Sequence, residues 1–360
     1  MDNMGENAEE PHAEQEDLGT KSKQELIFKI NRLMSENKRL KSRLAEHEPQ
    51  RQKKIRPPNP QKIEELFEQF ATKKYALKVC YLGGSYDGMA YQKESDNNTV
   101  EAYILRAMHS MSLIRELDAE ANDYTRAGRT DKGVSAMGNV IALRMRSNQR
   151  KNEGGQQKAT KKISHCSMLN AILPDDIRII GLEEVSDDFN ARYWCIKRSY
   201  KYFFPKNNLS IERMEEAIKH FEGTHNFLNY CKMNLTNTVS FEKTIFEAKV
   251  VSSSIDEVFA DDRNRIYYFH FVGNSFLWHQ IRFMSSVLFL VGCGKEEPSI
   301  VRDLLDLEKF PRKPNYPMAP DYALILEDCL YEQVHFEPDA DTIISFYNTY
   351  MRVYAASMLW

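Results

Sequence analysis

The segment 123-DYTRAGRTDKGVSAMGNVIAL-143 carries an unusual density of charge between two apolar runs. The apolar residues at its two ends predict strands over 122–126 and 138–146. Gly128 and Gly133 allow a tight loop between these strands and a close approach of the backbone to a ligand. The segment is therefore expected to be the connection between two strands of one sheet, with its charged residues in the loop.

Asp131 is the candidate for chemistry within this loop, because it lies between Arg129 and Lys132. Neighbouring cations favour the ionised form of a carboxyl group, so Asp131 is available as a nucleophile or a base. An aspartate that caps a turn is the alternative interpretation, and spacing alone does not decide between the two.

The sequence on both sides of this segment predicts a strand–helix–strand–strand–helix–strand pattern, and then the same pattern again. Such a duplication indicates an α+β fold of two ferredoxin-like halves. If their sheets associate edge to edge, a central cleft forms that is lined by the loops between paired strands. The expected elements are, in order, strand 75–81, helix 99–114, strands 122–126 and 138–146, helix 163–173, strand 177–185, strand 198–204, helix 211–221, strands 243–252 and 265–272, helix 276–291 and strand 322–331.

Composition limits the class of protein. The chain has 360 residues, of which 42% are hydrophobic, so it can bury a substantial core. Its six cysteines form no CxxC pair, which argues against a zinc site and against a disulfide framework. No apolar run reaches 18 residues and the acidic start lacks the plan of a secretory signal, so we expect no membrane association and a location in the nucleus or cytoplasm.

The net charge of -3 hides a strongly uneven distribution. Residues 1–20 hold seven acidic and no basic residues, whereas residues 21–62 hold thirteen basic and four acidic ones. Residues 144–162 hold seven basic residues and one acidic residue. Basic blocks of this kind suit a polyanionic partner, and solvated loops and tails are the alternative.

Residues 26–44 carry Leu, Ile or Asn at alternating spacings of four and three, which is a short heptad seam. Leucines occupy the d positions and Asn37 occupies an a position, an arrangement that favours a two-stranded parallel coil. A single helix packed on its own domain is the alternative. A homodimer through this coil or through the globular part is therefore one expected assembly.

These observations divide the chain into six regions. They are an acidic disordered tail (1–20), a coiled coil (21–48), a basic Pro-rich linker with a short helix (49–74), a first half (75–190), a second half (191–335) and a C-terminal helix (336–360).

The segment Arg126–Val134, "RAGRTDKGV", resembles the signature R-[AC]-G-R-T-D-x-G-V of the TruA family of tRNA pseudouridine synthases. Further resemblance lies in "VCYLGGSYDGMAYQ" (79–92), in the region 169–204, and in "VGNSFLWHQIRFMSSVLFLVG" (272–292), so that it covers about 75–331. The residues of the signature, the N-terminal coil and "FLWHQIR" are most similar to those of the eukaryotic branch, which acts on positions 38 and 39 of the tRNA anticodon arm.

Two departures from the bacterial pattern concern Ser135, where a histidine is usual, and Tyr86–Asp87, which lie within a longer first loop. The resemblance implies the same two-half fold and the isomerisation of uridine to pseudouridine in the anticodon stem-loop of tRNA. No cofactor and no metal are needed for that reaction, because nothing is gained or lost.

The resemblance also implies roles for particular residues. Asp131 is the catalytic carboxylate, Tyr200 packs on the base and moves a proton, and Arg282 pairs with Asp131 across the cleft. Without it, Tyr200 would be interpreted as a core residue and Arg282 as a surface charge at a helix end.

Four further residues are expected to bind the tRNA substrate. Arg129 is expected to stabilise the extruded nucleotide or to fill its place, whereas Trp278 and His279 are interpreted as packing residues. The candidates for substrate binding are Arg129, Arg126, Lys132 and Tyr202.

Three alternatives stay open at this point. They are a related synthase that acts at other tRNA positions, a non-catalytic tRNA-binding protein on the same scaffold, and a coiled-coil adaptor with an incidental globular part.

Overall fold

A computed structural model describes residues 58–91, 98–151, 165–233, 240–253, 263, 265–337, 340 and 342–349. The expected acidic tail, the coiled coil and residues 49–57 of the basic linker lie outside the described residues, as do residues 152–162 of the second basic block. The predictions for these regions are therefore not tested by the structure.

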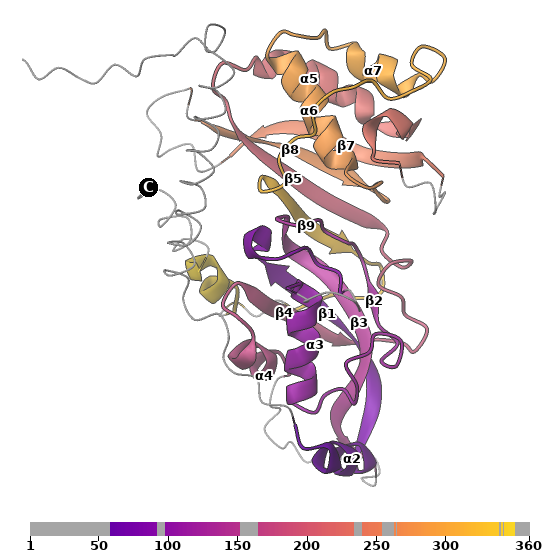
Figure 1. Cartoon of the computed structure of the whole chain (residues 1–360), viewed down its shortest axis with the longest axis vertical. Helices are drawn as coiled ribbons and strands as arrows, with labels where there is room; N and C mark the ends of the chain where they lie inside the picture. Colours follow the sequence, from indigo (N-terminus) through magenta and orange to yellow (C-terminus); the bar gives the residue numbers. More distant parts are fainter. Residues whose placement is uncertain are drawn as a thin grey trace, which may run out of the picture. The chain divides into compact units, whose positions relative to one another are not determined.

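Helices and strands alternate along the described chain much as the sequence predicts (Figure 1). From residue 60 to 184 the elements are α2 (Pro60–Gln69), β1 (Phe70–Tyr81), α3 (Val100–Ser110), β2 (Thr125–Arg126), β3 (Ser135–Arg150), α4 (His165–Ile172) and β4 (Ile177–Glu184). From residue 197 to 330 they are β5 (Lys197–Pro205), α5 (Ile211–Ile218), β6 (Gly223–Asn226), β7 (Glu242–Ser252), β8 (Ile266–Gly273), α6 (Gln280–Gly292), α7 (Ile300–Leu305) and β9 (Leu324–Leu330).

All nine strands of the described residues belong to one sheet with the order β4-β1-β3-β9-β5-β8-β7-β6, and β2 pairs with β3 beside this path. The first part of the sheet (β1 to β4) and the second part (β5 to β9) are joined by the pairing of β3 with β9, which is parallel and pairs Ser135 with Ile325 and Ala136 with Leu326. The other strand pairs are antiparallel. The chain thus has a mixed α+β fold built on one large sheet, and the loop between β2 and β3 ends where the two parts meet.

The helices cover the sheet and bury its apolar side chains. Thr99 caps α3, since its hydroxyl accepts a hydrogen bond from the amide of Ala102, and Ser210 caps α5 in the same way. Nearly every residue of α6 is buried, and its Phe289 packs against Tyr202 and Phe204 of β5. The buried residues of both parts form one continuous core cluster, so the sheet and its helices pack as one unit.

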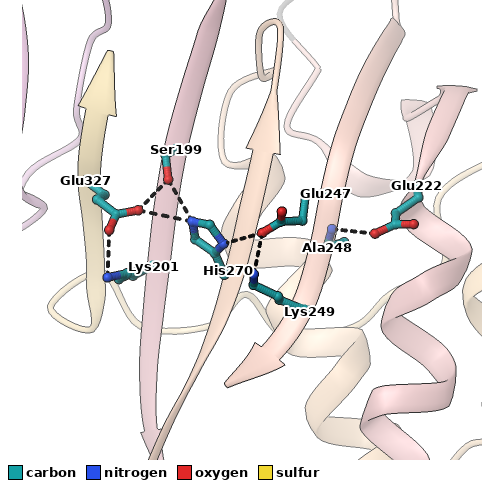
Figure 2. Close-up of polar contacts among 8 residues, drawn as sticks. All are labelled: Ser199, Lys201, Glu222, Glu247, Ala248, Lys249, His270 and Glu327. Carbon is teal, nitrogen blue, oxygen red and sulfur yellow. Dashed lines mark hydrogen bonds and ion pairs between the residues drawn. The ribbon is translucent and has the colours of Figure 1, made fainter. Parts of the chain in front are cut away.

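The other face of β5, β7, β8 and β9 carries a chain of charged side chains, drawn in Figure 2. Strand residues alternate between faces, and Tyr200 and Tyr202 point into the core, so Lys201 points to the opposite face. There, Nδ1 of His270 lies 2.8 Å from Glu247 and its Nε2 lies 3.1 Å from Glu327. The network is completed by Ser199, Lys201 and Lys249.

The structure differs from the expected elements in a few places. β6 and α7 were not expected, β2 has only two residues, and β3 continues to Arg150. Within the expected C-terminal helix, residue 340 and residues 342–349 are helical, and Phe346 packs against Cys80 and Ile180. In the described part of the chain, every helix is too short or too polar to cross a bilayer.

Candidate active site

A cavity of about 730 Å³ lies where the β2–β3 loop faces the start of α6. Residues 124–131 and Val134 form one wall, and residues 275–281 form the opposite wall. Arg198 and Tyr200 of β5 also line the cavity, together with Asn190, Arg192, Tyr193 and Leu324. The charged segment that the sequence singled out therefore lines a cavity between the two parts of the sheet.

The strands beneath the β2–β3 loop hold its backbone in place. The hydroxyl of Thr130 lies 2.7 Å from the hydroxyl of Tyr81, and the Thr130 carbonyl accepts a hydrogen bond of 3.1 Å from the amide of Met89. Nδ2 of Asn139 donates to the carbonyl of Gly128 at 3.1 Å. Gly133 takes a positive φ of 83°, which favours glycine at this turn. The loop that carries Asp131 is consequently fixed on both sides of that residue.

Arg198 connects backbone segments on the two sides of the cavity. Its side chain is buried, and Nε and Nη2 donate to the carbonyl of Ala127 at 3.2 and 2.9 Å. Nη1 donates to the carbonyl of Asn274 at 2.6 Å, and Nη2 also donates to Arg192 at 2.9 Å. Nη1 also donates to the carbonyl of Cys195 at 3.5 Å. A guanidinium presents several donors in one rigid plane, so this single residue contacts four backbone carbonyls.

Asp131 projects into the cavity and contacts the wall that comes from the second part. The indole Nε1 of Trp278 donates a hydrogen bond of 3.1 Å to Oδ1 of Asp131. Nε2 of His279 lies 3.3 Å from Oδ2 of the same carboxylate. The carboxylate is thus held by both of its oxygens while about a third of the side chain stays exposed to the cavity.

His279 has an unusual backbone conformation for a residue other than glycine. It takes φ 62° and ψ 10°, in the left-handed region, immediately before α6 begins at Gln280. Burial lowers the pKa of its imidazole, and the nearby Asp131 opposes that shift. At neutral pH the ring is therefore predominantly uncharged.

Tyr200 lies beneath the loop, on β5. Its ring packs edge-on against Phe276 with 5.1 Å between centroids, and 9% of the residue is exposed. A Cβ on Gly128 would lie 3.8 Å from the Tyr200 hydroxyl, so the loop passes directly over the phenol. Burial raises the pKa of Tyr200 well above its ordinary value, so the phenol is protonated at neutral pH.

Arg282 does not take the position that the sequence analysis expected. Its Nε donates to the carbonyl of Ala319 at 2.7 Å, and its Nη2 lies 4.0 Å from Asp321. The expected ion pair with Asp131 is absent from the contacts of the described residues. The guanidinium of Arg282 is directed instead at the segment 319–321, where it contacts Ala319 and Asp321.

Arg126 and Arg129 both line the cavity but in different ways. Arg126 forms an ion pair with Glu101, whose side chain is fully buried, and Arg126 also lies over the ring of Tyr124 at 5.3 Å. Oε2 of Glu101 accepts a hydrogen bond of 2.7 Å from the amide of Tyr91. Arg126 is therefore engaged in holding the start of the loop, whereas Arg129 is exposed at the cavity and available to a ligand.

The other two candidates for substrate binding lie outside the cavity lining. Lys132 forms an ion pair of 2.6 Å with Asp87 on the outer side of the loop, with 77% of its side chain exposed. Tyr202 is 2% exposed and its hydroxyl donates to the carbonyl of Pro320 at 3.0 Å. The expectation for Tyr202 is corrected. Tyr202 lies two residues beyond Tyr200 on β5, so its ring points to the same face of the strand, but it is buried in the core and does not line the cavity.

Three residues of the site were missed or misjudged by sequence reasoning. Arg198 was not singled out, although an arginine in an apolar strand is itself a signal that a buried partner exists. Trp278 and His279 were interpreted as packing residues, and they contact Asp131 instead.

Comparison with known proteins gives a consistent result. A family model described as tRNA pseudouridine synthase matches residues 217–332. The tRNA pseudouridine(38/39) synthase of Saccharomyces cerevisiae is 38% identical over 336 residues, which are 89% of this chain and 73% of the relative. The human protein of the same name is 35% identical over 88% of this chain and 68% of its own length.

The cattle protein of that name is 38% identical over 76% of this chain, and the match spans 59% of the relative's length. Relatives that share over a third of their residues across most of the chain confirm the resemblance that the segment Arg126–Val134 indicated. The chain belongs to the tRNA pseudouridine synthase family.

Proposed function

We propose that this protein isomerises uridine to pseudouridine in the anticodon arm of tRNA, at positions 38 and 39. The observation that carries the proposal is the carboxylate of Asp131, which is held by both oxygens inside a cavity and still accessible from it. The names of the relatives from yeast, human and cattle support the choice of positions.

The chemistry requires a carboxylate next to the sugar and no further reagent. The bond between N1 and C1′ breaks, the base turns, and a bond between C5 and C1′ forms, while one proton moves from C5 to N1. Asp131 either attacks C1′ or assists the departure of the base, as the nucleophile of a retaining glycosidase does. Because the product is an isomer of the substrate, no cofactor and no metal enter the reaction.

Tyr200 and Arg129 take the two other roles. The Tyr200 phenol lies under the loop at the floor of the cavity, where it can pack on the uracil and pass on the proton that leaves C5. Arg129 is exposed next to Asp131 and carries a positive charge to the backbone of an extruded nucleotide. Extrusion costs a few kcal/mol and least where pairing is already weak, which suits a target at the junction of stem and loop.

Binding of the tRNA backbone is assigned to basic residues, but fewer of them than the sequence suggested. Arg144 of the block 144–162 forms ion pairs of 3.6 and 3.0 Å with two aspartates, and Arg146 is buried over the ring of Phe70. Lys151 donates to a backbone carbonyl. The cations left for phosphates in this block are Arg150, which is exposed and lies 5.7 Å from the ring of Phe70, and Lys158, Lys161 and Lys162, which lie outside the described residues.

The strand order supports a duplicated ferredoxin-like unit. In β4-β1-β3-β2 and in β9-β5-β8-β7, each set of strands follows the order fourth, first, third, second along its own segment of the chain. Pairing of the Asn37 side chains across a parallel coil is the proposed route to a homodimer, and the nucleus and cytoplasm, where tRNA is present, are the proposed compartments.

The test is an assay of purified protein with a tRNA transcript that carries uridine at positions 38 and 39. Pseudouridine at these positions, and its loss in Asp131→Asn with tRNA binding retained, is the expected result, because the amide keeps the shape of the side chain and loses its charge. Tight binding without any pseudouridine would favour the non-catalytic alternative, and pseudouridine at other positions would favour a related specificity.

A further inference from the structure

We propose that Trp278 and His279 are positioning residues that aim the carboxylate of Asp131 at the sugar of the substrate. The inference rests on the proposed function, in which Asp131 is the catalytic carboxylate. It differs from the expected arrangement, in which an ion pair with Arg282 would orient Asp131.

The two contacts fix the plane of the carboxylate. Trp278 Nε1 donates to Oδ1 at 3.1 Å and His279 Nε2 lies 3.3 Å from Oδ2, so one donor contacts each oxygen. The rings of the two donors are themselves adjacent, with 4.7 Å between centroids. Lys232 Nζ lies 4.5 Å from the centroid of the Trp278 ring, in a cation–π contact. Rotation of the Asp131 side chain would break the hydrogen bond with Trp278 and the contact with His279.

The proton of the His279 ring can be assigned from its surroundings. Nδ1 is buried and, among the described residues, has no hydrogen-bond partner. A proton on Nδ1 would therefore be buried without an acceptor, whereas a proton on Nε2 points at a carboxylate. The neutral ring is therefore assigned a proton on Nε2, the nitrogen that lies 3.3 Å from Oδ2 of Asp131.

The backbone of the segment indicates that this arrangement is specified rather than accidental. His279 adopts the left-handed conformation, with φ 62°, although it carries a side chain. This conformation reverses the direction of the chain just before α6 and places two consecutive side chains, those of Trp278 and His279, on the same carboxylate. In a regular strand or helix, consecutive side chains point in different directions.

The indole of Trp278 and the neutral ring of His279 contact the carboxylate without adding a charge beside it. They restrict its rotation, and they leave it with most of its negative charge and with lone pairs directed into the cavity. They also come from the second part of the sheet, whereas Asp131 belongs to the first. The orientation of the carboxylate consequently depends on both parts being in contact.

The test compares variants that remove one donor and keep the rest of the side chain. Trp278→Phe removes the indole N–H and preserves an aromatic ring for Lys232, and His279→Leu removes the second donor. Loss of one hydrogen bond to a charged group should lower the single-turnover rate at saturating tRNA roughly tenfold or more, with the dissociation constant for tRNA changed less than about twofold. His279→Gln, which restores an N–H near the Nε2 position, should recover most of the rate.

Trp194→Phe is the matched control, because Trp194 packs on Phe189 away from the cavity and should leave the rate unchanged. A wild-type rate in both Trp278→Phe and His279→Leu would overturn the inference. So would a loss that appears only in tRNA binding or only together with a lower melting temperature. A failure of the proposed function looks different: the wild-type protein would make no pseudouridine, or Asp131→Asn would stay active.

Discussion

Replacement of Arg198 by lysine tests whether one buried side chain holds the two walls of the cavity together. Arg198 donates through its three nitrogens to four backbone carbonyls, those of Ala127, Arg192, Cys195 and Asn274. Lysine keeps the charge but has one nitrogen, which cannot reach all four carbonyls at once. At least one buried carbonyl is then left without a donor.

The expected cost follows from these contacts. An unsatisfied buried polar group costs about 1–3 kcal/mol, so Arg198→Lys should lower the free energy of unfolding by roughly 3 kcal/mol once the lost bonds to a charged donor are included. In a domain of this size the melting temperature would fall by roughly 5 °C. The single-turnover rate should fall as well, because Ala127 lies in one wall of the cavity and Asn274 directly precedes Ser275, the first residue of the opposite wall.

The assay combines thermal unfolding, followed by circular dichroism, with pseudouridine formation at saturating tRNA. Arg106→Lys is the control, since Arg106 is exposed on α3 and should tolerate the change in both measurements. If Arg198→Lys melts and reacts like the wild-type protein, water or the lysine has replaced the lost donors. The guanidinium of Arg198 would then not be required to connect the two sides of the cavity.

Other side chains give further predictions. Tyr200→Phe should keep the packing on the base but lower the single-turnover rate, and an unchanged rate would remove Tyr200 from proton transfer. Burial would raise the pKa of Glu327, yet hydrogen bonds from its neighbours, His270 among them, lower it from 4.5 to about 2. Its contribution to stability is therefore complete above about pH 5 and is lost as the pH falls toward 2. Glu327→Gln should flatten the acid limb of a stability curve in that window, and an unaltered limb would contradict the network. Replacing Lys158, Lys161 and Lys162 by glutamine should reduce the slope of log affinity against log salt by roughly 2, and an unchanged slope would assign them to solvent.

Much of the fold was predictable because its signals are local. Alternating apolar residues marked β5 and β8, and an apolar helix pattern marked α6. β6 was missed because "GTHN" is polar and is a strand only through its pairing with β7. α7 is six residues long, which is too short for a helical period to be recognised.

The site was predictable in part for the same reason. The residue types around Asp131 identified the loop and the resemblance. The contacts of Arg198 with backbone carbonyls are between segments about 70 residues apart, and no local pattern encodes them. The directions of the Trp278 and His279 side chains depend on the left-handed backbone conformation of His279. Propensities for helix or strand do not reveal such a conformation.

The short pairing of β3 with β9 has a consequence for local opening of the sheet. Two residue pairs join these strands, whereas ten join β1 to β3. Amide protons at Ala136 and Leu326 should therefore exchange with solvent by a local opening that costs less than global unfolding, while those at the centre of the β1–β3 ladder exchange more slowly. Such an opening would separate Asp131 from the donors that come from the other side. A bound tRNA that contacts both parts of the sheet would oppose this opening, so hydrogen exchange at Ala136 should slow when tRNA is added. The exchange rate of the free protein would then report how often the catalytic arrangement forms in the absence of tRNA.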